Sequence, residues 1–273
     1  MIFQRLIWAA LAVAVLVGSL QSGVQQLQAV PIILAAEVFE SQKVDAPEPA
    51  APAMAAAHTH SDGAAHDHGE AGKEWAPTDG VERVFWTWVA NVLHAFSMAL
   101  LFFAVMGFSL VRGSSLRSLS LAAWAAAAGW LTFHFWPSLG LPAEIPGMDA
   151  ARLGSRQGWW ALAAGSAALA CVSLAMLRSP LRWVAAAAWL ALPFVVGAPH
   201  IAADPLAGFS GEAEATLRRL GTQFIWATTW VSLSFWVSMG LAGGLAFQRW
   251  LRPALLAVLQ RADAPAGAVQ APQ

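Results

Sequence analysis

The residues best suited to chemistry lie together in one polar segment, residues 58–69. It contains four of the seven histidines as two His-x-His pairs, with two aspartates interleaved: His58, His60, Asp62, His66, Asp67 and His68. Imidazole and carboxylate are ligands that first-row divalent cations such as cobalt, nickel, zinc and copper accept. The surrounding Ala, Gly and Pro cannot build a packed core, so we expect a mobile segment able to wrap an ion. A low-complexity linker that happens to contain histidine is the alternative.

Further candidate ligands lie near the ends of apolar segments. Glu37 and Glu40 are three residues apart, so a helical turn would place both carboxylates on one face. They would form an acidic mouth that attracts cations, or simply mark the solvated end of a helix. His134 and His200 lie at the ends of two apolar segments, and either one alone reads as an interfacial residue. Together these residues place potential metal ligands on one side of a membrane.

His94 lies inside the apolar segment 84–111, roughly 15 Å from its outer edge at helical rise. An ionisable residue at that depth is a functional hypothesis by default. Thr87, Asn91, His94 and Met98 follow an i, i+4, i+7, i+11 pattern on one helical face. Amide oxygen, imidazole and thioether would make a weak relay for a soft or borderline cation. A neutral histidine hydrogen-bonded to a neighbouring helix is the alternative.

The composition indicates an all-α membrane protein. Of the 273 residues 58% are hydrophobic and 11% are charged, whereas soluble domains carry about 25% charged residues. The single cysteine, Cys171, excludes an internal disulfide and a multi-cysteine metal site. The sequence has no phosphate-binding glycine loop, no zinc-protease helix and no basic nucleic-acid face. We therefore expect no enzyme, no nucleic-acid partner and no permanently bound cofactor.

Six apolar segments are long enough, or nearly so, to cross a bilayer, which needs about 20 residues. They lie at residues 4–36, 84–111, 116–136, 157–178, 181–198 and 221–247. We expect the first to tilt or break near Pro31. The expected organisation is therefore a first transmembrane helix, a disordered His-rich outer loop, a five-helix membrane region and a tail, at residues 1–37, 38–83, 84–248 and 249–273.

Charge bias sets the expected orientation. With the N-terminus inside, the cytoplasmic ends hold eight basic residues and one acidic residue, Asp263, while the other side holds seven basic and fifteen acidic residues. Every short loop assigned inside is basic, as the positive-inside rule requires. This predicts a multi-pass protein of the bacterial inner membrane with both termini in the cytoplasm.

Four segments of this chain carry a family resemblance: residues 25–40, 137–147, 156–160 and 192–200. The second contains three prolines and two glycines, which exclude a helix and predict an irregular loop carrying Glu144. Together they resemble the CbtA family of proposed cobalt transporter subunits. The resemblance implies cobalt uptake for cobalamin synthesis and a small single-span CbtB-like partner subunit. The family is often described with five spans, which leaves five as the alternative to six.

The leading hypothesis is a membrane subunit of a divalent metal transporter, with cobalt as the cargo. The His-rich loop would capture the ion, the outer carboxylates and histidines would form a vestibule, and His94 would mark the passage. A metal-sensing or assembly subunit that translocates nothing is the second hypothesis. A haem protein with paired histidines is the third, and it is disfavoured because His94 and His134 lie at different expected depths.

Overall fold

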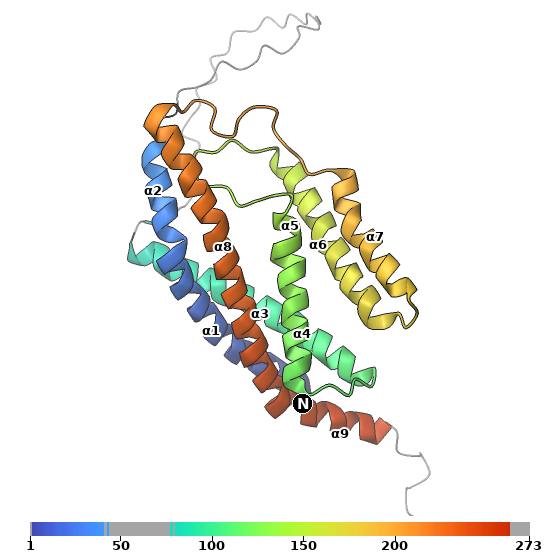
Figure 1. Ribbon diagram of the computed structural model, residues 1–273. Coiled ribbons are helices and arrows are strands. Elements are labelled where there is room, and N and C mark those ends of the chain that lie inside the picture. The colour runs from blue at the N-terminus through green and yellow to red at the C-terminus, as the bar shows by residue number, and fades with distance from the viewer. Residues whose placement is uncertain (1, 41–42, 44–76, 79, 263–273) are drawn as a thin grey trace, which may run out of the picture.

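The computed structural model describes residues 2–40, 43, 77–78 and 80–262. All regular secondary structure in these residues is helical (Figure 1). The predicted all-α architecture is confirmed for this part of the chain. The histidine segment 58–69 lies outside the described residues, so its capture role stays a prediction.

The first apolar segment forms two helices. Helix α1 covers Ile2–Gln28 and α2 covers Val30–Glu40, with a turn at Ala29 between them. Pro31 has no backbone N–H, and the chain changes direction just before it (Figure 1). The predicted break near Pro31 is therefore confirmed.

The other expected segments are also helical. Helix α3 covers Val81–Val111, α6 covers Leu153–Met176, α7 covers Leu181–Val196 and α8 covers Gly211–Ala246. Between α3 and α6, α4 (Ser118–Trp130) continues through a π-helical turn, η1 (Leu131–Phe135), into α5 (Trp136–Ser138). After α8 the chain continues through a second π turn, η2 (Phe247–Leu251), into α9 (Arg252–Ala262), so the expected tail begins as helix.

Four of the described helical segments are long and apolar enough to cross a membrane: Ile2–Gln28, Val81–Val111, Leu153–Met176 and Gly211–Arg261. Helix α7 is apolar but shorter. The run from Ser118 to Ser138 lies outside this set, because its histidine and tryptophans lower its mean hydropathy. The full count of six spans thus stays a prediction.

Three connections expected outside meet at one end of the molecule. The Asp149 amide donates to the Pro205 carbonyl at 2.7 Å, which joins the α5–α6 connection to the α7–α8 connection. Lys43, just after α2, pairs with Asp149 at 2.5 Å. Ala36, Ile145 and Leu206 share a small buried apolar cluster at this end. At the opposite end Arg252 donates to Ser118 at 3.3 Å.

The main core joins α1, α3, α4 and α8 through small residues. An added Cβ would lie 3.0 Å from Ala126 at Gly240 and 2.8 Å from Ala122 at Gly244. At Gly18 it would lie 2.7 Å from the Val92 Cα. Such close helix contacts are typical of membrane bundles. Gly240 and Gly244 therefore let α8 approach α4 closely.

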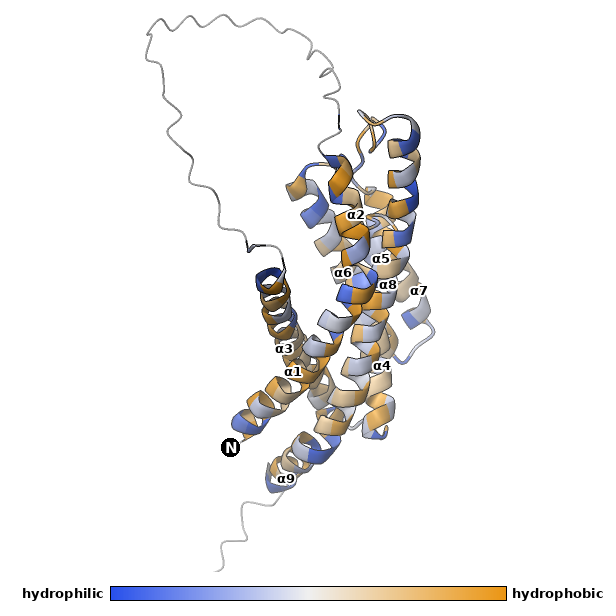
Figure 2. Cartoon of the chain, turned by 90° about the vertical axis from the view of Figure 1, so that its left-hand side faces the viewer, coloured by the Kyte–Doolittle hydropathy of each residue, from blue (hydrophilic) through white to orange (hydrophobic). Residues whose placement is uncertain are grey.

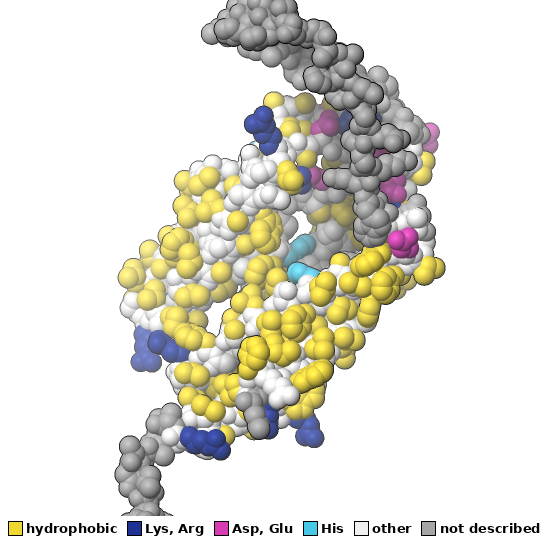
Figure 3. Space-filling view, turned by 180° about the vertical axis from the view of Figure 1, so that it is seen from behind, with side chains coloured by type: hydrophobic (Ala, Val, Ile, Leu, Met, Phe, Trp, Pro, Cys, Tyr) yellow, Lys and Arg dark blue, Asp and Glu magenta, His cyan; other side chains and the backbone are white. Residues whose placement is uncertain are grey.

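Polarity is distributed along the long axis of the molecule. Strongly hydrophilic residues concentrate toward the two ends, with apolar residues between them (Figure 2). In the rear view, acidic side chains gather at one end, while the opposite end shows basic side chains only (Figure 3). This distribution agrees with the predicted charge bias. Between the ends, histidine side chains lie beside a hollow flanked by apolar surfaces (Figure 3).

Candidate functional site

The face of α3 that carries His94 turns toward its neighbouring helices. Asn91 Nδ2 donates to Gln25 Oε1 at 2.6 Å and to Ser22 Oγ at 3.0 Å on α1. Met98 packs against the main core, and the His94 ring lies 5.2 Å from the Phe235 ring on α8. His94 itself is exposed and forms no hydrogen bond to a described residue.

The contacts of α3 bear on the relay predicted from Asn91, His94 and Met98. Asn91 uses its amide donors to join α1 to α3, so it acts first as an interhelical contact. Buried Gln21, one turn from Gln25, has a side-chain oxygen with no partner among the described residues. His94 and Met98 stay candidate ligands. His94 has a ring contact with Phe235 and no hydrogen bond to a described residue, so the alternative of a structural His94 also stays open.

Two of the predicted carboxylates, Glu37 and Glu144, form ion pairs. Glu37 Oε1 lies 3.0 Å from Arg83 Nη2, and Glu144 Oε2 lies 2.5 Å from Arg156 Nη2. Glu40 and His200 are exposed. Among the described residues, no three His, Cys, Asp or Glu side chains form a group that could hold a metal ion. The expected vestibule is therefore not a single multi-ligand site in this part of the chain.

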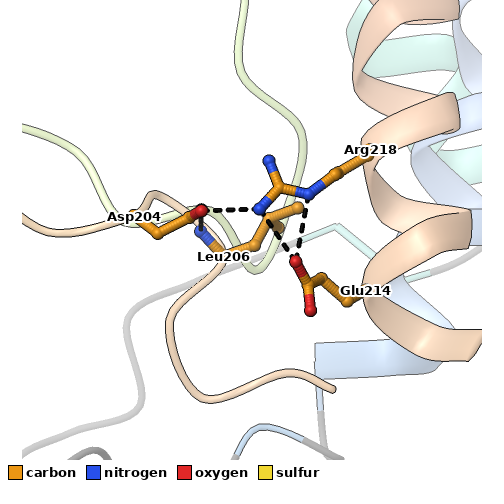
Figure 4. A network of polar contacts seen from close by, with 4 residues as sticks. All are labelled: Asp204, Leu206, Glu214 and Arg218. Carbon is orange, nitrogen blue, oxygen red and sulfur yellow. Dashed lines mark hydrogen bonds and ion pairs between the residues drawn. The ribbon is translucent and has the colours of Figure 1, made fainter. Parts of the chain in front are cut away.

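A second set of charges is also paired at the end of the molecule where Lys43 meets Asp149. Asp204 accepts a hydrogen bond from the Leu206 amide at 2.9 Å and another from Arg218 at 2.5 Å (Figure 4). Arg218 also contacts Glu214 at 2.8 Å. The Leu206 hydrogen bond and then the Arg218 guanidinium hold the pKa of the Asp204 carboxyl below its usual value. These groups fix the connection before α8, and Asp204 is committed to that contact.

His134 lies beside a cavity of about 160 Å³ between η1–α5, the following loop, α6 and α8. The walls include Phe133, Pro137, Trp160 and the paired threonines Thr228 and Thr229. His134 Nε2 lies 3.3 Å from Thr229 Oγ1. His134 is thus the predicted ligand that the fold places beside a cavity together with hydroxyl side chains.

The π turn explains how the chain reaches this cavity. We expected residues 137–147 to be irregular throughout, but Pro137 and Ser138 continue the helix. In an α-helix Pro137 would clash with the carbonyl of Phe133, four residues earlier. The wider turn at Leu131–Phe135 removes that constraint just before the proline. From Leu139 onward the segment is nonhelical, as predicted.

Sequence reasoning missed Thr228, Thr229 and Ser138 as cavity residues. The signal was two adjacent threonines within the mostly apolar stretch at residues 221–247. Threonine hydroxyls commonly bond their own helix in membrane proteins, so the signal alone does not select them. Their position opposite His134 comes from the packing of α8 against η1.

Three of the segments that carry the family resemblance meet at the N-terminal end of α6. Gly140 lies so close to the Trp159 ring that an added Cβ would be 2.2 Å from it. The Trp159 indole donates to the Pro193 carbonyl at 3.0 Å. The Glu144–Arg156 ion pair joins the same loop to the start of α6. These segments are therefore mutually dependent parts of one structural joint.

The helical fold, the apolar segments and the polar groups buried between helices define an integral membrane protein. Within that class, the chain belongs to the CbtA family, described as probable cobalt transporter subunits, which it matches over residues 3–248. No curated protein and no solved structure is detectably similar to the chain.

Proposed function

We propose that this chain is the membrane subunit through which a divalent metal ion, cobalt, crosses the bacterial inner membrane. The CbtA family match is the observation that carries the proposal. It covers residues 3–248, and the four helical segments long enough to span a bilayer lie wholly or mostly within that range. The word "subunit" in the family description supports a multi-subunit transporter. A small single-span CbtB-like chain is the proposed partner.

The proposed capture step uses His58, His60, His66 and His68 with Asp62 and Asp67. From there the ion would pass exposed Glu40 and His200, then His134, and then His94 with Met98. Glu37 and Glu144 support this route indirectly, because their ion pairs fix α2 and the outer loop. A route of isolated ligands suits conduction, which requires binding weak enough for release.

We propose six spans with both termini in the cytoplasm. The meeting of residue 43 and the two later outer connections at one end supports this topology. The basic residues at the opposite end support the orientation. Under this topology η1 and the His134 cavity lie in the outer half of the membrane region.

Labelled cobalt uptake, with nickel and zinc as competitors, tests the function. Cells lacking other cobalt importers would express the chain with and without its proposed partner. Uptake that depends on the chain supports a transporter. Absence of uptake in every combination, with the protein confirmed in the membrane, would favour the sensing or assembly alternative.

In the same uptake assay, His94→Ala should reduce cobalt uptake while the level of the protein in the membrane stays unchanged. Ser97→Ala on the same helix is the control.

Metal capture by the loop should depend on pH, since neutral imidazole binds metal and imidazolium does not. Cobalt binding to the full chain should weaken as pH falls below about 6.5, the ordinary pKa of histidine. A chain with all four loop histidines replaced by alanine should lose most of this dependence. Binding that is indifferent to pH between 5 and 8 would contradict the capture step.

A further inference from the structure

The hydrogen bonds around His134 determine which of its two ring nitrogens can bind a cation. Thr229 Oγ1 lies 2.8 Å from the Ile225 carbonyl, which can only accept. The single hydroxyl proton of Thr229 is therefore used in that bond. In its contact with His134, 3.3 Å away, Thr229 must accept, so Nε2 of His134 carries the ring proton. The neutral ring then has its free lone pair on Nδ1.

Other hydroxyls around the cavity are arranged in the same way. Thr228 donates to the Ile225 carbonyl at 3.0 Å, and Ser138 donates to the Phe135 carbonyl at 2.9 Å. Each hydroxyl proton is committed to its own helix, so each oxygen has lone pairs but no proton left to offer. A cation is favoured by such oxygens, and an anion is not.

The size and walls of the cavity suit a partly hydrated ion. A volume of about 160 Å³ corresponds to about five waters at about 30 Å³ each. One wall is aromatic: the Phe133 ring lies 6.4 Å from the Trp160 ring, and both residues line the cavity. A nitrogen ligand, oxygen ligands and retained waters together are typical of a borderline divalent cation.

We propose that this cavity is a discrete binding station for a divalent first-row cation, with His134 Nδ1 as its nitrogen ligand. Thr229 is a positioning residue, because its hydroxyl fixes the tautomer that leaves Nδ1 free. Thr228 and Ser138 supply oxygens to the ion or to its waters. The inference rests on the proposed function for the identity of the cargo, but the site itself is defined by this geometry.

The test uses the full-length chain in lipid nanodiscs with the four loop histidines replaced by alanine, so that loop binding is silent. Binding of Co²⁺ would be measured by equilibrium dialysis for this background, His134→Ala, Thr229→Val, Thr229→Ser and Thr222→Val. Thr222 is a matched control, because it lies on the same helix, donates to the Arg218 carbonyl at 3.0 Å and does not line the cavity. Nitrogen NMR of labelled histidine would report the tautomer of His134.

We expect His134→Ala and Thr229→Val to weaken Co²⁺ binding by about tenfold or more, the usual effect of losing a ligand or its orienting partner. Thr229→Ser keeps the hydroxyl and should retain both the affinity and the Nε2–H tautomer. Thr229→Val should give a mixture of tautomers, which a loss of packing alone would not produce.

Equal Co²⁺ affinity in the background, His134→Ala and Thr229→Val chains would overturn the station, as would Thr222→Val matching Thr229→Val. The cellular uptake assay separates this failure from failure of the proposed function. Cobalt uptake that persists in His134→Ala cells would remove the station from the route while leaving the transporter assignment intact. Absence of uptake by the wild-type chain would remove the transporter assignment, while the nanodisc measurement would still decide the binding site.

Discussion

At the scale of single residues, the chemistry depends on which polar groups are already committed. Glu37, Glu144 and Asp204 all carry guanidinium partners, so none of them is an open carboxylate. His134 has one nitrogen bound to Thr229, which leaves the other for a ligand. Exposed Glu40, His94 and His200 stay uncommitted among the described contacts. The candidate route therefore consists of separated ligands.

Asp204 gives a pH prediction at this scale. Its folded-state pKa is lowered by the Leu206 amide first and by Arg218 second. The contact should therefore stabilise the α7–α8 connection above the unfolded pKa of about 3.9 and be lost as pH falls through the lower folded value. The protection of residues 203–210 against hydrogen exchange, taken relative to the intrinsic exchange rate at each pH, should fall on acidification toward pH 3.

The matched variant for this experiment is Asp204→Asn, which keeps an oxygen that can accept from Leu206 but has no charge for Arg218. Its protection against exchange, relative to the intrinsic rate, should be lower than that of the wild type at neutral pH and change little with pH. Equal exchange in the two proteins across the whole range would show that the ion pair contributes nothing to this connection.

At the scale of elements, the outer loop and the helices α6 and α7 form one joint. The loop contacts α6 through Gly140 against Trp159 and through the Glu144–Arg156 pair. Helix α6 contacts α7 through the Trp159–Pro193 hydrogen bond. Because each contact needs the others for its position, a change at one should loosen all three.

Gly140→Ala tests the packing of this joint. The new methyl group would meet the Trp159 ring, which is buried and hydrogen-bonded and cannot easily move. We expect a loss of about 1–3 kcal/mol in the free energy of unfolding, the usual cost of overpacking. Thermal unfolding in detergent would measure it. Gly165→Ala on α6 is the control, since nothing lies within 4 Å of the added Cβ.

A charge exchange tests whether Glu144 is structural. Both side chains of the Glu144–Arg156 pair are 29% exposed. Glu144→Arg or Arg156→Glu alone should each cost about 1–3 kcal/mol of stability, because each leaves a partly buried charge without its partner. The double exchange should recover much of the stability and of the cobalt uptake. Recovery of stability without recovery of uptake would instead indicate that Glu144 itself contacts the ion.

At the scale of the whole molecule, the fold has one acidic, heavily connected end and one basic end. The outer connections are joined by the Lys43–Asp149 pair and the Asp149–Pro205 hydrogen bond. Because these three connections lie at the same end, the chain must run to the other end of the bundle and back between one connection and the next. That geometry favours membrane passage by α4–η1–α5 and α7, whose hydropathy or length alone is marginal.

Cysteine labelling tests this topology, since Cys171 is the only native cysteine. In a Cys171→Ala background, Ala150→Cys should react with a membrane-impermeant maleimide in intact cells. Ser179→Cys should react only after permeabilisation. A four-span arrangement, in which only the longest helices cross, predicts the opposite result at both positions. Ser210→Cys is the control, because it should be accessible from outside in either arrangement.

The sequence alone determined the features that depend on local composition and periodicity. Apolar length predicted the helical segments, and Pro31 predicted the break after α1. Each of these follows from hydrophobicity or a missing N–H, which act over a few residues. The charge bias likewise needed only the order of loops along the chain.

Tertiary structure alone decided which polar groups meet. Glu37 and Arg83 are 46 residues apart, and His134 and Thr229 are 95 residues apart. No local pattern encodes such pairs, because they depend on the crossing and register of packed helices. For the same reason the sequence could list candidate ligands but could not tell that Glu144 is paired with Arg156 or that His134 borders a cavity. The joint formed by Gly140, Trp159 and Pro193 also became visible only when distant segments came together.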